Sequence, residues 1–494
     1  MKYISSRNKE NLVSWSEAMV EGIAQDGGLF VPQEFPQIKN LADMVNMDYK
    51  EIAHEIIGAY FPSIEEADLG SIIDRAYDDK FSRKDIAPLE EVGDVHILEL
   101  FHGPTLAFKD MALSILPHLL KKAMEIEGIE EELVILTATS GDTGKAALEG
   151  FADMDRIKII VFYPRDGVSE IQKRQMISQE GKNTFVIGIE GNFDDAQGGV
   201  KDIFRDRDLG GEMQGAGYRL SSANSINIGR LVPQIVYYFH AYLSLLREKK
   251  LESGQKINIV VPTGNFGNIL AAYYGKKMGL PVNKLICASN ENNVLYDFIN
   301  TGLYDRRREL KLTSSPSMDI LVSSNLERLL YHISGQDHEY VRKKMEDLNT
   351  KGYYKVEELE MDDFYAGYST EKEVEKSIGE VFDHEYYLMD PHTAVAYNVY
   401  RKYRDETGDK TLTVIASTAS PYKFGRAVAA GLGLDTGDLD EFQILSHLEG
   451  RTRLAIPKAI GELGQKPILH KTICTKGEMK SKLMKILQVG DKDD

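Results

Sequence analysis

The stretch Leu98-Glu-Leu-Phe-His-Gly-Pro-Thr-Leu-Ala-Phe-Lys-Asp110 places a lysine where a predicted strand gives way to a predicted helix. The apolar run 95–101 predicts a β-strand, and His-Gly-Pro ends it. The apolar periodicity from Phe108 to about Glu127 predicts an amphipathic helix. Lys109 therefore lies at the start of this helix, with apolar side chains on its N-terminal side.

The position of Lys109 has two interpretations. An apolar pocket near the positive end of a helix disfavours an ammonium group, so Lys109 is a candidate for a neutral amine that reacts covalently with a carbonyl compound. The alternative is an ordinary exposed lysine at a helix start. This segment alone does not decide between them.

A second segment predicts a binding site for an anion. The short β-rich run 256–261 leads into Pro262-Thr-Gly-Asn-Phe-Gly-Asn268, and a helical pattern follows. Gly264 and Gly267 permit a close approach of the backbone, and the amides of the first helical turn point at the anion. A plain strand-to-helix turn is the alternative.

A third segment, 132–147, again runs from a buried strand through a turn into a helix. Its turn, Thr139-Ser-Gly-Asp-Thr143, offers several N–H and O–H donors that suit a carboxylate, although helix capping also explains it. The segment ends like a P-loop, but the upstream glycine is missing and Ala146 stands where a metal-binding hydroxyl belongs.

The three segments resemble motifs of the threonine synthase family. Ser222-Ala-Asn-Ser-Ile-Asn227, Asp390-Pro-His-Thr-Ala-Val-Ala-Tyr397 and the opening Asp26-Gly-Gly-Leu-Phe-Val-Pro32 also resemble that family's motifs, in its order. The resemblance extends from near residue 1 to beyond residue 430 and is closest to the subgroup of enteric bacteria and fungi. It implies an α/β protein of pyridoxal-phosphate fold type II, the tryptophan synthase β-like fold, with two parallel-sheet lobes and a mainly helical N-terminal domain.

The resemblance also implies residue roles. Lys109 carries the cofactor pyridoxal 5'-phosphate and transfers protons. The further cofactor-binding residues are Gly264, Asn265, Phe266, Gly267, Asn268, Thr418 and Asp142. Thr418 is expected to face the pyridine nitrogen, with Ser417 as the adjacent rival. The substrate carboxylate is assigned to Ser140, Gly141 and Thr143, and the substrate phosphate to Asn224, Ser225, Asn227 and Arg230.

Two of these assignments raise questions that the sequence leaves open. Asp142 lies beside the expected carboxylate site, where a second carboxylate is repulsive unless it points away or accepts a hydrogen bond. His392 belongs to a family-like motif, but no chemical role follows for it.

The order of elements agrees with the α/β class. Predicted helices alternate with predicted strands, as in mostly parallel sheets; the strands are Leu133–Ala138, Ile157–Tyr163, Thr184–Ile189, Ile257–Val261, Lys284–Ala288 and Leu412–Ala416. We expect an N-terminal domain over 1–88, a catalytic core of two lobes over 89–434, and a C-terminal segment, 435–494, that closes on the core and frays at its end. The acidic segment 353–383 is expected to be irregular surface.

Composition narrows the function further. A chain of 494 residues is too long to fold around one compact core, so more than one domain is expected. The net charge of −18 argues against nucleic acid as a binding partner. No segment approaches a charge-free membrane span, and two cysteines form neither a disulfide framework nor a metal site. We therefore expect a cytoplasmic enzyme without a metal, either a monomer or a homodimer.

The expected reaction converts O-phospho-L-homoserine and water to L-threonine and phosphate. The nearest rival is a phospho-lyase or dehydratase on the same scaffold that releases a 2-oxo acid. A catalytically silent cofactor-binding regulator predicts a damaged Lys109 or a damaged carboxylate turn, and both are intact.

Overall fold

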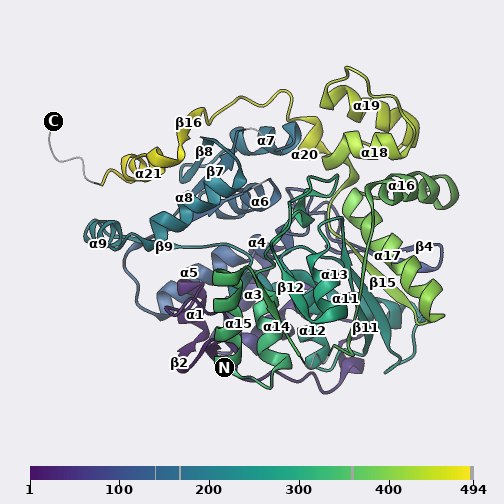
Figure 1. Cartoon of the computed structure of the whole chain (residues 1–494), viewed down its shortest axis with the longest axis horizontal. Coiled ribbons are helices and arrows are strands. Elements are labelled where there is room, and N and C mark those ends of the chain that lie inside the picture. The colour runs from purple at the N-terminus through teal and green to yellow at the C-terminus, as the bar shows by residue number, and fades with distance from the viewer. Residues whose placement is uncertain (140, 166–167, 358–360, 490–494) are drawn as a thin grey trace.

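The computed structural model describes residues 1–139, 141–165, 168–357 and 361–489. Two sheets, each buried between helices, form two lobes (Figure 1). The larger sheet has the order β14-β11-β10-β15-β5-β4, and only β4 runs antiparallel to its neighbour. Its strands are β4 (Leu89–Val92), β5 (Val95–Glu99), β10 (Ile257–Pro262), β11 (Val282–Ser289), β14 (Phe364–Tyr368) and β15 (Thr413–Ser417).

The smaller sheet has the order β16-β8-β7-β6-β9, and all of its pairs are parallel. Its strands are β6 (Glu132–Ala138), β7 (Ile157–Pro164), β8 (Thr184–Glu190), β9 (Tyr218–Ser221) and β16 (Thr472–Thr475). The expected pair of parallel-sheet lobes is confirmed, because each strand run predicted from the sequence is a strand of one of these sheets.

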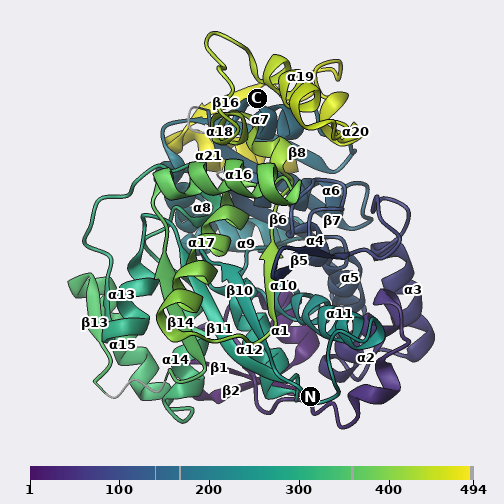
Figure 2. The same cartoon turned by 90° about the vertical axis from the view of Figure 1, so that its right-hand side faces the viewer.

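Helices cover both faces of each sheet, as parallel sheets require. The smaller lobe carries α4 (Asp110–Leu113), α5 (Leu116–Ile126), α6 (Asp142–Phe151), α7 (Glu170–Ile177), α8 (Phe193–Arg205) and α9 (Arg207–Gly215). The larger lobe carries α10 (Ile228–Leu231), α11 (Pro233–Arg247), α12 (Gly267–Lys277), α13 (Val294–Thr301), α14 (Leu326–Ile333), α15 (His338–Lys351), α16 (Glu371–Glu385), α17 (Pro391–Thr407) and α18 (Gly425–Gly431). Helix α17 packs along β10, β11, β14 and β15 (Figure 2).

The N-terminal region contains α1 (Trp15–Glu21), α2 (Tyr49–Tyr60) and α3 (Glu66–Ala76), so it is mainly helical as expected. It also contains a three-stranded antiparallel sheet that the sequence did not predict: β1 (Lys2–Ser5), β2 (Asn8–Ser14) and β3 (Phe30–Pro32). Helix α2 packs on α11 and α1 packs on α5, so this region is part of the main hydrophobic core.

The helix expected over 108–127 is broken, which corrects the prediction. Helix α4 ends at Leu113, and α5 begins at Leu116 with Pro117 in its first turn. Proline has no amide hydrogen, and its ring excludes an acceptor four residues earlier. The freed Leu113 carbonyl lies against Gly150, where a Cβ atom would meet it at 2.1 Å.

The segment 353–383 was expected to be irregular surface, and this prediction is wrong. Its described part contains β13 (Tyr353–Lys355), which pairs with β12 (Leu303–Asp305), the buried edge strand β14, and most of α16. Half of its acidic residues lie on α16, whose apolar face packs on α17. Charge on one face of the helix concealed the apolar positions on the other.

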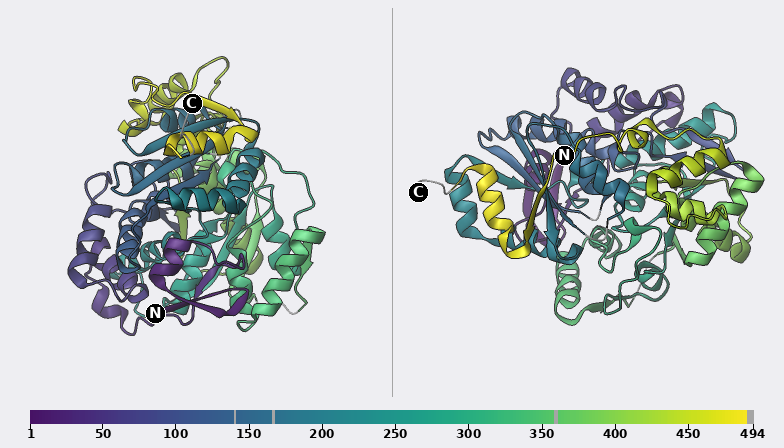
Figure 3. Two further views of the ribbon diagram at one scale, coloured as in Figure 1. Left: turned by 90° about the vertical axis from the view of Figure 1, so that its left-hand side faces the viewer. Right: turned by 90° about the horizontal axis from the view of Figure 1, so that it is seen from above.

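The C-terminal segment contains α19 (Glu441–Thr452), α20 (Lys458–Gly461), β16 and α21 (Met479–Leu487). It returns across the molecule, and α21 lies against α8 of the smaller lobe (Figure 3). Strand β16 extends the smaller sheet by pairing with β8. The end that was expected to fray, 490–494, lies outside the described residues.

Candidate active site

The predicted site segments lie together because each follows the carboxyl end of a parallel strand. The Lys109 loop follows β5, the hydroxyl turn follows β6, the anion loop follows β10, and Thr418 follows β15. In parallel sheets these ends meet at one edge, where ligands usually bind. The two lobes present these edges to each other, so Lys109 from one reaches Asp142 from the other, 3.8 Å apart.

Lys109 is held by a compact loop. The Thr105 backbone N–H donates to the Asp110 carboxylate at 2.8 Å, and the Thr105 hydroxyl donates to it at 2.5 Å. A Cβ atom on Gly103 would meet Asp110 at 2.5 Å, so this turn requires glycine. The Phe108 N–H donates to the Thr418 carbonyl at 2.8 Å, which places Lys109 next to the end of β15.

The Lys109 side chain is only 11% exposed, so it is not the ordinary exposed lysine of the second interpretation, although its amine faces polar groups rather than an apolar pocket. Its Nζ donates to the Ser317 hydroxyl at 3.3 Å and lies near Asp142. Burial lowers the pKa of the Lys109 ammonium to about 8. The Asp142 carboxylate opposes this shift, whereas the Lys423 and Arg230 charges increase it. Lys109 is therefore a buried amine that loses its proton far more readily than a surface lysine.

We expect Lys109 in the cofactor-free chain to react with an amine-labelling reagent with a midpoint near pH 8. Deprotonation makes the amine nucleophilic, so labelling rises with pH; at pH 7 roughly 9% of Lys109 is neutral against about 0.03% for an ordinary lysine. Competitive acetylation followed by peptide mass spectrometry measures this midpoint, and exposed Lys121 serves as the control. A Lys109 midpoint equal to that of Lys121 contradicts the prediction.

Asp142 resolves the question of repulsion that the sequence raised. Its Oδ1 accepts from Lys423 Nζ at 2.7 Å and from Gln172 Nε2 at 2.8 Å. Burial raises the pKa of the Asp142 carboxyl, but Lys423 and Lys109 outweigh burial and hold it well below its usual range. The charge of Asp142 is thus neutralised inside the protein, and the adjacent turn stays free for a substrate carboxylate.

Sequence reasoning missed Lys423, which is fully buried and also donates to the Thr105 carbonyl at 2.7 Å. A local signal existed, because Lys423 lies between Tyr422 and Phe424 just after a strand. The same criterion, a lysine among apolar neighbours at a strand-to-helix junction, had identified Lys109.

Replacing Lys423 with methionine is expected to lower the free energy of unfolding by about 3 kcal/mol, because one partner of a buried ion pair is removed. Chemical denaturation at pH 7 measures the change. The double variant Lys423→Met, Asp142→Asn is the control and should recover most of the loss, since neither charge of the Lys423–Asp142 pair is then left without the other. Equal losses in the single and double variants contradict this account.

The hydroxyl turn is built around Thr139. Its Oγ1 accepts from the N–H groups of Gly141 at 3.0 Å and Gly144 at 2.9 Å. Gly141 has φ of +148°, and a Cβ atom there would meet Gln172 at 2.6 Å, so glycine is required. Thr143 lies half-buried in the first turn of α6. Ser140, also assigned to the carboxylate, lies outside the described residues.

The anion loop 263–268 leads from β10 into α12. In the described part of the chain, the amide N–H groups from Gly264 to Asn268 donate to no protein acceptor. Phe266 has a left-handed backbone, with φ of 62°, which turns these amides toward one side. A Cβ atom on Gly264 would meet the Ser317 carbonyl at 2.5 Å. Five free donors at a helix N-terminus fit a phosphate group.

Two further contacts fix this loop. The Ser323 hydroxyl donates to the Gly264 carbonyl at 2.7 Å, and the Asn325 N–H donates to the Asn265 carbonyl at 3.1 Å. The buried Asn268 Oδ1 accepts from Tyr237 at 2.6 Å, while its Nδ2 has no partner among the described residues. A buried amide group without a partner is rare and suits an anionic ligand.

Arg230 is another buried donor without a full set of partners. It is 2% exposed, its Nη1 donates to the Ala223 carbonyl at 2.8 Å, and its Nε has no acceptor. Burial lowers the pKa of its guanidinium to about 10. Within the described residues no carboxylate pairs with Arg230, so the guanidinium is free for a phosphate dianion.

The polar residues assigned with Arg230 differ in how many of their hydrogen-bonding groups already have protein partners. The Asn224 Oδ1 accepts from Thr137, and the Ser225 carbonyl accepts from Asn325 at 3.2 Å. The Asn227 side chain caps α10 through the Gly229 N–H and donates to the Met19 and Ser222 carbonyls. All hydrogen-bonding groups of the Asn227 amide are thus in use, which indicates that it shapes this loop.

Thr418 and Ser417 are distinguished by their partners. The Ser417 hydroxyl lies 2.8 Å from the Thr393 hydroxyl and is fully buried. No described residue receives or gives a hydrogen bond at the Thr418 hydroxyl. This favours Thr418 over Ser417 as the residue that meets a ligand.

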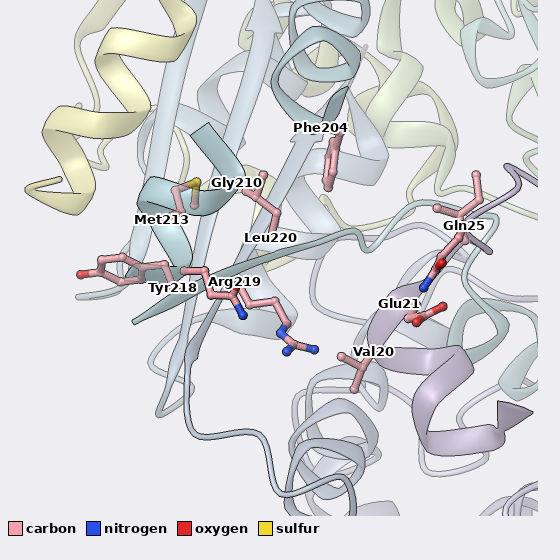
Figure 4. A pocket seen from close by; sticks show the side chains of 11 residues that line it. Val20, Glu21, Gln25, Phe204, Gly210, Met213, Tyr218, Arg219 and Leu220 are labelled. Carbon is pink, nitrogen blue, oxygen red and sulfur yellow. The ribbon is translucent and has the colours of Figure 1, made fainter. Parts of the chain in front are cut away.

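A cavity of about 420 Å³ lies elsewhere, between α1 and the α9–β9 region (Figure 4). Glu21, Phe204, Met213 and Arg219 are among its lining residues, and the residues assigned above are not. Among the described residues no cluster of three or more His, Cys, Asp or Glu side chains is suited to a metal ion. No described helix has the length and apolar character of a membrane span.

Comparisons with known proteins show the family of this chain. Residues 2–77 match the family model "Threonine synthase N terminus", 86–418 match "Pyridoxal-phosphate dependent enzyme", and 393–464 match "Threonine synthase, C-terminal". Threonine synthase of Pseudomonas aeruginosa is 39% identical over 88% of this chain and 91% of its own length. Threonine synthase-like 1 of Homo sapiens is 42% identical over 85% of this chain, which spans only 58% of that relative.

A solved structure of a threonine synthase is also similar to this chain. The pyridoxal-phosphate-bound threonine synthase from Brucella melitensis superposes with a TM-score of 0.86, at 35% identity and over 99% of both chains. The free amides of the anion loop, the unpartnered Asn268 amide and the buried Lys109 amine fit this cofactor. The chain therefore belongs to the threonine synthase family of pyridoxal-phosphate-dependent enzymes.

Proposed function

We propose that this chain converts O-phospho-L-homoserine and water to L-threonine and phosphate. The observation that carries the proposal is the buried Arg230, which has no carboxylate partner among the described residues and contributes to the low pKa of Lys109. A free guanidinium this close to a reactive amine suits a substrate whose leaving group is a phosphate dianion.

Lys109 holds the cofactor covalently and moves protons during the reaction. With a pKa of about 8 it accepts and returns a proton near neutral pH, as an acid–base catalyst must. Bound pyridoxal phosphate supplies an electron sink for charge that develops on the substrate. The amides of Gly264 to Asn268 would hold the cofactor phosphate, Thr418 would be the hydroxyl available to the pyridine ring, and Asp142 would contribute to the cofactor site.

The remaining assignments place the substrate. Ser140, Gly141 and Thr143 bind its carboxylate, next to an Asp142 whose charge Lys423 and Lys109 neutralise. Arg230, with Asn224, Ser225 and the loop shaped by Asn227, binds its phosphate. Both proposed anion sites lie near Lys109, because Asp142 of the turn is 3.8 Å from its amine and the Arg230 charge acts on its pKa, so together they would orient the substrate at this amine.

A rival activity on the same scaffold is a lyase that releases 2-oxobutyrate. The purified protein, loaded with pyridoxal phosphate, is incubated with O-phospho-L-homoserine, and threonine, 2-oxobutyrate and phosphate are quantified together. Threonine and phosphate in equal amounts support the synthase. Phosphate with 2-oxobutyrate indicates the lyase, and the absence of phosphate release rejects this substrate.

We also propose a cytoplasmic enzyme that acts as a monomer or homodimer and does not bind nucleic acid. Both cysteines, Cys287 and Cys474, are buried free thiols, which suits a reducing compartment. The division into an N-terminal domain 1–88, a core 89–434 and a C-terminal segment 435–494 remains a proposal, and limited proteolysis between these parts tests it.

A further inference from the structure

The motif Asp390-Pro-His-Thr393 has no role in the function proposed above, yet its side chains are buried at the start of α17. The Asp390 carboxylate caps this helix by accepting from the N–H groups of His392 at 2.9 Å and Thr393 at 3.3 Å. A cap of this kind needs only the carboxylate. The buried imidazole of His392 and the Thr393 hydroxyl therefore require another explanation.

The contacts of His392 determine which of its nitrogens carries the hydrogen. The backbone N–H of Ser317 donates to His392 Nε2 at 3.3 Å, so Nε2 is an acceptor. The other nitrogen, Nδ1, lies 2.7 Å from Asp390 Oδ1 and donates to it. Asp390 thus fixes both the ring orientation and the tautomer of His392, as a carboxylate commonly does for a functional histidine.

The turn that His392 holds, Pro316–Met318, contacts two parts of the site. The Ser317 hydroxyl accepts from Lys109 Nζ at 3.3 Å. The Ser317 carbonyl lies where a Cβ atom on Gly264 would meet it at 2.5 Å, so the turn also packs against the anion loop. A displacement of this turn therefore disturbs the reactive amine and the phosphate donors together.

A second branch from Asp390 reaches the end of β15. The Thr393 hydroxyl donates to Asp390 Oδ2 and lies 2.8 Å from the Ser417 hydroxyl. Ser417 ends β15, immediately before Thr418. One buried carboxylate is thus connected to the Ser317 turn and to the strand end that presents Thr418.

We propose that His392 is a positioning residue for cofactor binding, which holds the Ser317 turn against Lys109 and the Gly264 loop in an orientation fixed by Asp390. This inference rests on the proposed function only in taking the Lys109 region as the cofactor site. It does not depend on which product the enzyme releases.

Two substitutions of His392 separate positioning from simple helix capping. In His392→Asn the amide nitrogen takes about the position of Nδ1, so the hydrogen bond donated to Asp390 is kept. The asparagine has no group at the position of Nε2, so the Ser317 N–H loses its acceptor. In His392→Gln the amide oxygen reaches about the place of Nε2 and accepts from the Ser317 N–H. Both variants keep the backbone N–H groups that Asp390 caps, so they are matched controls for each other.

The first measurement titrates pyridoxal phosphate into the full-length chain after removal of bound cofactor. We expect His392→Asn to raise the Kd at least tenfold, and His392→Gln to stay within threefold of the unchanged protein. The labelling midpoint of Lys109 is expected to rise by about one pH unit toward 10.5 in His392→Asn only, because the loosened turn admits water. Equal Kd values in the two variants overturn the proposal.

A third variant keeps the proposal testable if either His392 variant fails to fold. Ser317→Ala removes the hydroxyl that contacts Lys109 and retains the N–H that donates to His392. We expect it to shift the Lys109 labelling midpoint while the Kd for pyridoxal phosphate changes less than threefold. An unchanged midpoint overturns the link between the turn and Lys109. Cofactor binding and amine labelling are read without substrate, so failure here is distinct from failure of the proposed reaction.

Discussion

Lys109→Ala is expected to reduce threonine formation from O-phospho-L-homoserine by about 10³-fold or more. The variant loses the residue proposed to hold the cofactor covalently and to transfer protons, and acid–base catalysis alone contributes about 10²–10⁴-fold. Lys423, the buried lysine whose charge also acts on Lys109, is not available as a substitute, because it is engaged by Asp142 and by the Thr105 carbonyl. The rate is measured from threonine and phosphate under saturating cofactor.

Borohydride reduction provides an independent measurement for Lys109. In the unchanged protein, reduction should leave the mass of the cofactor on the peptide that contains Lys109, and in Lys109→Ala on no single peptide. Lys121→Ala, on the exposed side of α5, is the control and should retain activity and labelling. Attachment of the cofactor to another lysine would reject the assignment of Lys109.

Arg230→Met is expected to lower kcat/KM for O-phospho-L-homoserine by about 100-fold without lowering stability. The loss corresponds to roughly 3 kcal/mol, within the range for removing one partner of a buried, hydrogen-bonded charge pair. In the ligand-free protein the same guanidinium is buried without a carboxylate, and its charge costs free energy. Methionine has a similar length and removes this charge, so the melting temperature should be equal or higher.

Arg219→Met is the matched control for this experiment. Arg219 is partly exposed, pairs with Glu131 at 3.2 Å, and lines the separate cavity near α1. Its removal should leave kcat/KM unchanged. A loss of activity in Arg230→Met that follows a loss of folded protein would mean that Arg230 has a structural role only.

Much of the fold could be predicted from the sequence because its signals are local. Buried parallel strands are short apolar runs such as Ile257–Pro262, and glycine-containing turns follow them at fixed positions. The helix broken at Pro117 and the concealed strand β14 show where local reasoning is weaker. At Pro117 the proline itself breaks the helix, a local signal that the apolar periodicity obscured. At β14 the pattern was consistent with two structures, and the pairing with β11, distant in the sequence, decided between them.

The residues of the candidate site also fall into two groups: those that local sequence signals predict, and those whose roles depend on contacts distant in the sequence. Lys109 and the anion loop could be found because a strand, a turn and a helix bring their reactive groups together within ten residues or so. The burial of Arg230 without a carboxylate partner could not be predicted, because the sequence pattern of a helix does not show which side chains of other elements will surround it. The free hydroxyl of Thr418, as against that of Ser417, also depends on a distant partner, Thr393.

The sequence by itself determined the alternation of strands and helices, and it predicted Lys109 as the reactive lysine and the glycines of the anion loop, since each depends on residues adjacent in the chain. The tertiary structure alone decided the pairing of Asp142 with Lys423, the contact of His392 with Ser317, and the addition of β16 to the smaller sheet. These contacts join residues far apart in the sequence. Their geometry follows from how the two sheets and their helices pack, which periodicity and motif spacing do not encode.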